Sequence, residues 1–126
     1  MLHNILIADN PSGCAQDYER FFTQQGYGVF VASSLKEARD LLIKQDFSVA
    51  LISENLVDSL NSPYLRDMKK NRGTCKFVLM SYSFDADLFV KAVDGLFHDC
   101  LAHPSSLSVL EEAVSNLIHL EDRVFK

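Results

Sequence analysis

The sequence predicts an α/β fold: a doubly wound, five-stranded parallel sheet in a three-layer (βα)5 sandwich. Five short runs of apolar residues alternate with stretches whose apolar residues have helical spacing. The third run, 48–52, is mostly apolar and so is typical of a strand buried on both faces, as in a parallel sheet. Strands that alternate with helices of this length form parallel sheets with right-handed crossovers, which place helices on both faces.

Each predicted strand is followed by polar residues. Asp9 and Asn10 follow the first strand, Ser53 follows the third, Ser81 follows the fourth and His103 follows the fifth. In open α/β sheets, ligands bind beyond the carboxyl ends of the strands, so we expect the functional residues at this edge. The predicted strands are 5–8, 28–32, 48–52, 77–80 and 99–102.

Local signals mark the helices between these strands. Ser34 with Glu37 forms a capping box, and Pro63 follows Ser62 at the first helical position of the next helix. Gly26 provides a helix stop. The predicted helices run from the turn at 11–13 to 26, from 34 to about 44, from 62 to 72, from the acidic turn at 85–87 to about 93, and onward from a cap at 105 or 106.

Length and charge limit the function classes. The chain has 126 residues, of which 48% are hydrophobic, so residues 1–126 are expected to form a single domain with a substantial core. The net charge of -5 argues against binding of nucleic acid or anionic membranes, and no apolar run is long enough to span a bilayer. Three widely spaced cysteines favour reduced thiols in a cytoplasmic protein.

The polar strand ends resemble those of a response-regulator receiver domain, a flavodoxin-like fold, and the resemblance covers nearly the whole chain. The stretch 47–57, FSVALISENLV, matches the family's third strand and places Ser53 at its phospho-accepting aspartate. The family's acidic pair after the first strand corresponds to Asp9 and Asn10. Its Ser or Thr after the fourth strand corresponds to Ser81, and its Lys-Pro after the fifth strand corresponds to His103 and Pro104. The resemblance implies a role in two-component or phosphorelay signalling.

The departures from the family pattern imply that phosphotransfer is lost. In the family, carboxylates hold Mg²⁺ and one of them attacks the phosphoryl group, whereas only Asp9 remains acidic among the matched positions. A hard dication prefers carboxylate ligands, so a vestigial site at Asp9, Asn10 and Asn55 should bind Mg²⁺ weakly at best. We therefore predict a pseudo-receiver that has no cofactor, is not an enzyme and acts through protein–protein interaction.

Two alternatives stay open at these strand ends. A working receiver could use Ser53 or Glu54 as a non-standard acceptor, although strand alternation predicts that Glu54 faces away from Asp9. A less favoured alternative is a Ser-His-Asp hydrolase built from Asp9, Ser53 and His103; Ser53 lacks a nucleophile-elbow motif.

Other motifs carry less weight. Cys14 and Arg20 have the C-x₅-R spacing of phosphatase loops, but the residues between them read as a helix. The His, Asp and Cys residues within 98–103 fit no familiar zinc spacing. The loop at 9–13 lacks the hydroxyl-rich run that would bind a flavin phosphate.

The resemblance also implies a partner surface. The family uses its fourth helix, fifth strand and fifth helix for partner or dimer contacts, which corresponds to about 84–120 here. Four apolar residues in this region are the expected contacts, unless they simply fill the core: Phe84, Phe89, Leu96 and Phe97. The partner would be another protein, an effector domain after Lys126 or a second copy of the chain.

Overall fold

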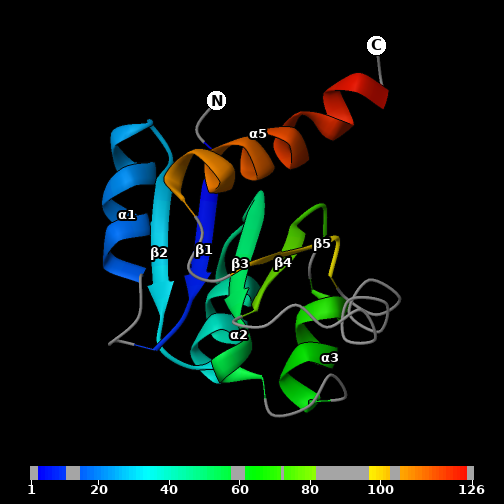
Figure 1. Cartoon of the computed structure of the whole chain (residues 1–126). Helices are drawn as coiled ribbons and strands as arrows, with labels where there is room; N and C mark the ends of the chain where they lie inside the picture. The colour runs from blue at the N-terminus through cyan, green and yellow to red at the C-terminus, as the bar shows by residue number, and fades with distance from the viewer. Residues whose placement is uncertain are drawn as a thin grey trace.

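The five-stranded parallel sheet predicted from the sequence is present in the computed structural model (Figure 1). The structure describes residues 3–10, 15–57, 62–71, 73–81, 97–102 and 106–124, with side chains described to residue 119. The helix predicted near 85–93, and with it Phe84, Phe89 and Leu96, lies outside these residues, as do Cys14 and His103.

The elements agree with the predicted order of strands and helices. The strands are β1 (Asn4–Ala8), β2 (Gly28–Ala32), β3 (Val49–Ser53), β4 (Lys76–Ser81) and β5 (Asp99–Ala102). The helices are α1 (Ala15–Gln24), α2 (Leu35–Lys44), α3 (Pro63–Lys70) and α5 (Leu107–Val124), with a short 3-10 helix, η1 (Glu54–Leu56), directly after β3. All strands are parallel, in the spatial order β2-β1-β3-β4-β5.

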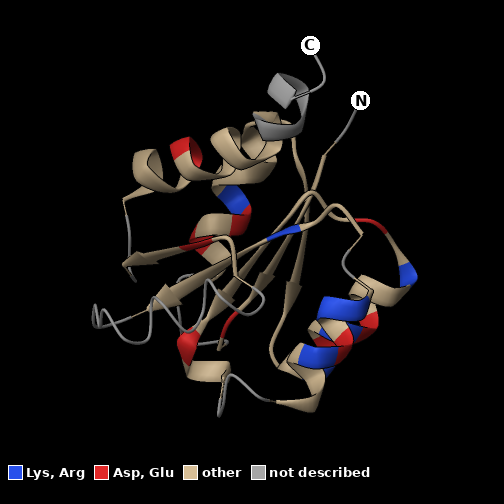
Figure 2. Ribbon diagram, turned by 90° about the vertical axis from the view of Figure 1, so that its right-hand side faces the viewer, with Lys and Arg blue, Asp and Glu red and all other residues tan. Residues whose placement is uncertain are grey.

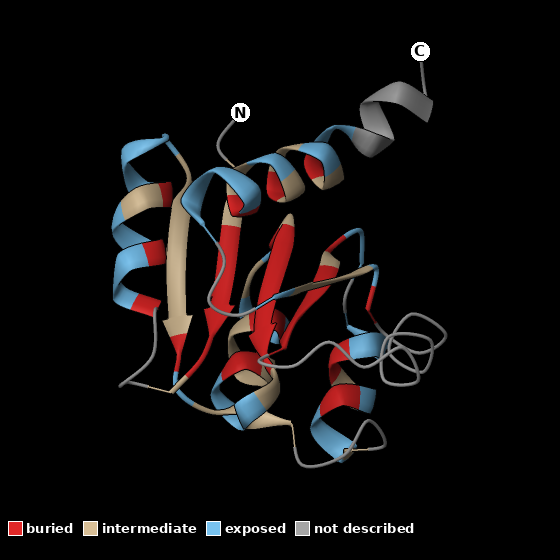
Figure 3. Cartoon of the chain, in the orientation of Figure 1, coloured by how far each residue is buried: buried red, intermediate tan, exposed pale blue. Residues whose placement is uncertain are grey.

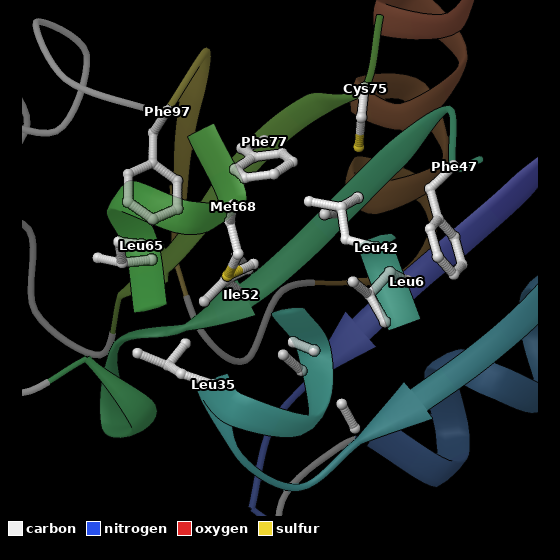
Figure 4. Close-up of a cluster of buried hydrophobic side chains, with 14 of the residues drawn as sticks. Leu6, Leu35, Leu42, Phe47, Ile52, Leu65, Met68, Cys75, Phe77 and Phe97 are labelled. Carbon is white, nitrogen blue, oxygen red and sulfur yellow. The ribbon is translucent and has the colours of Figure 1, made fainter. Parts of the chain in front are cut away.

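Helices cover both faces of the sheet, so its central strands are buried. One core cluster joins the sheet to α1 and α5 and includes Phe22, Val114 and Ile118. The other joins it to α2 and α3 and includes Leu42 and Met68 (Figure 4). All five residues of β3 are buried, and Figure 3 shows burial concentrated in the middle of the sheet and on the inner sides of the helices.

The predicted helix caps form. The Ser34 hydroxyl accepts a hydrogen bond from the Glu37 amide at 3.1 Å, and Ser62 caps α3 in front of Pro63. Ser106 accepts from the Val109 amide at 3.3 Å and so caps α5. Gly26 has a φ of 95°, a left-handed conformation that favours glycine, which explains why α1 ends there.

Charge is excluded from the strand interiors. In the described strands, charged residues occur only at the first positions of β4 and β5, Lys76 and Asp99. Figure 2 shows many charged residues on α2 and α3. No helix in the described part of the chain has the length and hydrophobicity needed to cross a bilayer.

We predict that Phe77→Ala lowers the free energy of unfolding by about 3–5 kcal/mol, because Phe77 is fully buried and truncation leaves a cavity. Urea unfolding followed by circular dichroism measures the change. The matched control is Ile43→Ala on α2, where the side chain is 56% exposed; this variant should change stability by less than about 1 kcal/mol. Equal losses in the two variants would contradict the assignment of Phe77 to the core.

Candidate functional site

Three polar side chains lie buried at the carboxyl edge of the sheet. Asp9 follows β1, Ser53 ends β3 and Ser81 ends β4, and they are 1%, 0% and 4% exposed. Ala8 pairs with Ile52 and Ser53 pairs with Met80, so the three residues lie at nearly the same level on neighbouring strands. Among the described residues, they are the only buried polar or charged ones. We call them the strand-end cluster.

Asp9 supplies the carboxylate of this cluster. Its Oδ1 accepts a hydrogen bond from the backbone amide of Asn10 at 2.7 Å, and its own amide donates to the carbonyl of Ala32 at 3.0 Å. The first bond stabilises the buried carboxylate, since an ionised group away from water needs hydrogen-bond partners. Asn10 itself is partly exposed at the rim.

Ser53 occupies the position matched to the family's phospho-acceptor, and its hydroxyl has a local structural role. The Oγ atom accepts a hydrogen bond from the Asn55 amide at 3.3 Å, so Ser53 is the N-cap of η1. Asn55, expected in a vestigial magnesium site, is exposed. A side chain that is 0% exposed and caps a helix is poorly placed to attack a substrate, which also disfavours the hydrolase alternative.

Glu54 follows Ser53 at this edge and contacts the end of β4, which lies on the opposite side of β3 from β1 and Asp9; the expectation that Glu54 faces away from Asp9 stays a prediction. Alternation no longer applies, because β3 ends at Ser53 and Glu54 begins η1. The Ser81 hydroxyl donates a hydrogen bond to Glu54 Oε2 at 2.6 Å. The glutamate carboxylate therefore joins the end of β3 to the end of β4, beside the strand-end cluster.

Cys100, on β5, is a partly buried thiol. Burial, followed by the nearby carboxylates of Asp99 and Glu54, raises the pKa of Cys100. The thiol is therefore more fully protonated near neutral pH than an ordinary cysteine, and it packs against the core.

The described residues form neither the metal site considered within 98–103 nor a phosphate-binding loop before Arg20. In the described part of the chain, no group of three or more His, Cys, Asp or Glu residues could hold a metal ion. His98 Nδ1 accepts a hydrogen bond from the Phe77 amide at 3.1 Å and so helps to join β4 to β5. Arg20 lies on α1, where residues 15–24 are helical as predicted and do not form a phosphate loop.

Phe97 corrects one prediction about the partner surface. Its side chain is only 3% exposed and belongs to the core cluster that includes Leu65 and Met68 on α3 (Figure 4). Burial leaves it little surface to offer a partner, so the core-filling alternative holds for this residue. The other three expected contacts lie outside the described residues.

Solved structures share this fold over nearly the whole chain. A receiver-domain protein from Methanospirillum hungatei matches with a TM-score of 0.83 and 17% identity over 98% of both chains. A receiver domain from Clostridium thermocellum matches with a TM-score of 0.83 and 21% identity, over 98% of this chain and 99% of that one. A Burkholderia pseudomallei response regulator containing a phosphorylated aspartic acid matches with a TM-score of 0.77 and 19% identity, over 96% of this chain and 72% of that one.

These likenesses establish that the chain has the CheY-like receiver fold. No protein-family model matches the sequence, and no curated protein matches it.

We predict that Glu54→Gln lowers the pKa of Cys100, because removing a nearby negative charge favours the thiolate. The pH dependence of Cys100 alkylation by iodoacetamide, followed by peptide mass mapping, measures this pKa. Glu112→Gln, an exposed change on α5, is the control and should leave the profile unchanged. An unchanged or higher pKa in Glu54→Gln would contradict the placement of Glu54.

Proposed function

We propose that this chain is a pseudo-receiver domain: a cytoplasmic signalling module of the two-component or phosphorelay type that works by protein–protein interaction, without aspartyl phosphorylation and without enzymatic activity. The receiver fold supports the signalling class, and the strand-end cluster supports the loss of phosphotransfer.

The observation that carries the proposal is that the Ser53 hydroxyl is buried and caps a helix. A serine cannot form an acyl phosphate, and its hydroxyl is a weak nucleophile unless a base activates it. Here the hydroxyl is fully buried and accepts the Asn55 amide as a helix cap. Ser53 therefore serves the local fold at the position where relatives would carry the acceptor.

The residues at this edge do not suit Mg²⁺. The ion prefers octahedral oxygen ligands, usually with one or two carboxylates. Asp9 is the one carboxylate of the strand-end cluster, and it is buried against the amide of Asn10. The neighbouring carboxylate of Glu54 accepts a hydrogen bond from Ser81, which makes its recruitment to a metal more costly.

The bond between Glu54 and Ser81 suggests why the domain needs no phosphoryl group. It places a carboxylate of the chain itself at the ends of β3 and β4. A hydrogen bond to a charged acceptor is worth about 1.5–3 kcal/mol. We infer that it holds this edge of the domain in one arrangement, independent of a phosphodonor.

Exposed apolar side chains on α5 support binding of a protein partner. The first turn of α5 exposes Leu107 and Val109, which are 38% and 47% accessible. These residues belong to the region that the resemblance assigns to partner or dimer contacts. We propose that a protein partner, an effector domain or a second copy of the chain binds there.

The alternative function is a phosphorylatable receiver with a non-standard acceptor. The position of Glu54 favours it over Ser53 as that acceptor, because its carboxylate contacts the strand-end cluster through Ser81. A glutamyl acyl phosphate is chemically accessible, whereas the buried Ser53 hydroxyl is committed to η1.

Incubation with acetyl phosphate and Mg²⁺, followed by intact-mass measurement, separates the two functions. We expect no gain of a phosphoryl group, while the B. pseudomallei regulator, which carries a phosphorylated aspartate, serves as the positive control. A phosphoryl gain in the wild-type chain that disappears in Glu54→Gln but persists in Ser53→Ala would overturn the proposal in favour of the alternative.

A further inference from the structure

A cavity lies at the opposite edge of the sheet from the strand-end cluster. It has a volume of about 500 Å³ and is lined by the starts of β1 and β4, the segment before β3, the turn before β4, and α5. This volume falls within the usual range for small-molecule sites. In Figure 1, the amino ends of β1 and β3 lie next to α5. The side chains that line it include His3, Asp46, Phe47, Ser48, Lys76, Leu117 and Ile118.

Backbone hydrogen bonds hold the polar wall of the cavity in place. The Ser48 amide donates to the Asn4 carbonyl at 2.8 Å, and the Lys76 amide donates to the Ser48 carbonyl at 3.0 Å. Three segments that are distant in sequence are thereby fixed side by side. The polar wall is part of the sheet and not of a loose loop.

A preformed pair of side chains lies on this wall. His3 Nδ1 and Ser48 Oγ are 2.7 Å apart and partly buried, although the two residues are 45 positions apart in the sequence. When the imidazole donates through Nδ1, the serine hydroxyl can direct its own proton at a ligand atom. The pair then offers a hydrogen-bond donor to an acceptor in the cavity.

The charges around the cavity favour a single negative charge on the ligand. Lys76 is partly buried and brings an ammonium group, whose Nζ donates to the Thr74 carbonyl at 3.1 Å. Among the described lining residues, Asp46 is the one acidic side chain, and it is exposed, so water weakens its repulsion of an anion. The single lysine matches one negative charge, and each further charge on the ligand would add repulsion from Asp46 without a second cation to balance it.

The remaining wall is apolar. Leu117 on α5 is partly buried and supplies most of the apolar surface that a ligand can reach, while Phe47 and Ile118, 4% and 9% exposed, belong to the core and present only their edges. A polar wall that faces an apolar one suits a ligand with a charged end and a hydrophobic body, because each part is then removed from water against a matching surface.

We propose that this cavity binds a small organic monocarboxylate. Lys76 and the His3–Ser48 pair hold the carboxylate, and Phe47, Leu117 and Ile118 contact the apolar part. The ligand would touch both the sheet and α5. The inference does not depend on the proposed function, since the cavity and the strand-end cluster share no residue.

Titration with benzoate, followed by amide chemical shifts in ¹H–¹⁵N NMR spectra of the full chain, tests the proposal. We expect saturable shifts centred on His3, Ser48, Lys76 and Ile118. Benzamide, which has the same ring without the charge, should bind at least about tenfold more weakly, as expected for the loss of a charged hydrogen bond.

Variants assign the charge contact. Lys76→Met keeps most of the aliphatic stem and should weaken benzoate binding by about tenfold or more. Ser48→Ala should weaken benzoate binding by a similar factor. The control is Lys69→Met, at an exposed position on α3, which should leave benzoate binding unchanged. The benzamide comparison uses the wild-type chain and so does not depend on the folding of any variant. Absence of saturable shifts at the cavity, or equal binding of benzoate and benzamide, would overturn the proposal.

Discussion

The buried hydroxyl of Ser53 at the end of β3 is the constraint on which the functional account depends. The central strand is covered on both faces, so its last residue is delivered to the carboxyl edge between Asp9 and Ser81. A carboxylate at that point would be a nucleophile and a metal ligand. A hydroxyl that caps η1 is a much weaker nucleophile and metal ligand, and this difference is the basis of the proposed function.

The neighbouring hydrogen bond from Ser81 to Glu54 connects the strand-end cluster to a second carboxylate. It joins the ends of β3 and β4 through a carboxylate that belongs to the chain, and the same carboxylate contributes to the raised pKa of Cys100 on β5. Glu54 therefore bonds to β4 and lies near the thiol of β5, where its charge disfavours the thiolate. This arrangement is consistent with a domain whose output is set by binding and not by phosphotransfer.

Much of the fold could be predicted from the sequence, because apolar periodicity and caps such as Ser34 and Ser62 are local signals. The convergence of Asp9, Ser53 and Ser81 followed from parallel strand order. The hydrogen bond between Glu54 and Ser81 could not be predicted, since it depends on where β3 ends and η1 begins. The family resemblance places Phe97 in a partner surface, but its burial beside α3 depends on tertiary packing that the sequence around it does not specify. The cavity at the amino edge brings together residues from four separate segments, 3–4, 46–48, 73–76 and 117–118, for which no local pattern exists.

The most direct test of the central claim is a titration with MgCl₂ monitored by the backbone amide shifts of Asp9, Asn10, Ser53 and Asn55, with KCl at matched ionic strength as the reference. The account predicts that Mg²⁺ moves these amides no more than KCl does, because the Asp9 carboxylate is buried against the Asn10 amide and the Glu54 carboxylate already accepts a hydrogen bond from Ser81. Saturable, Mg²⁺-specific shifts at Asp9 and its neighbours would contradict it.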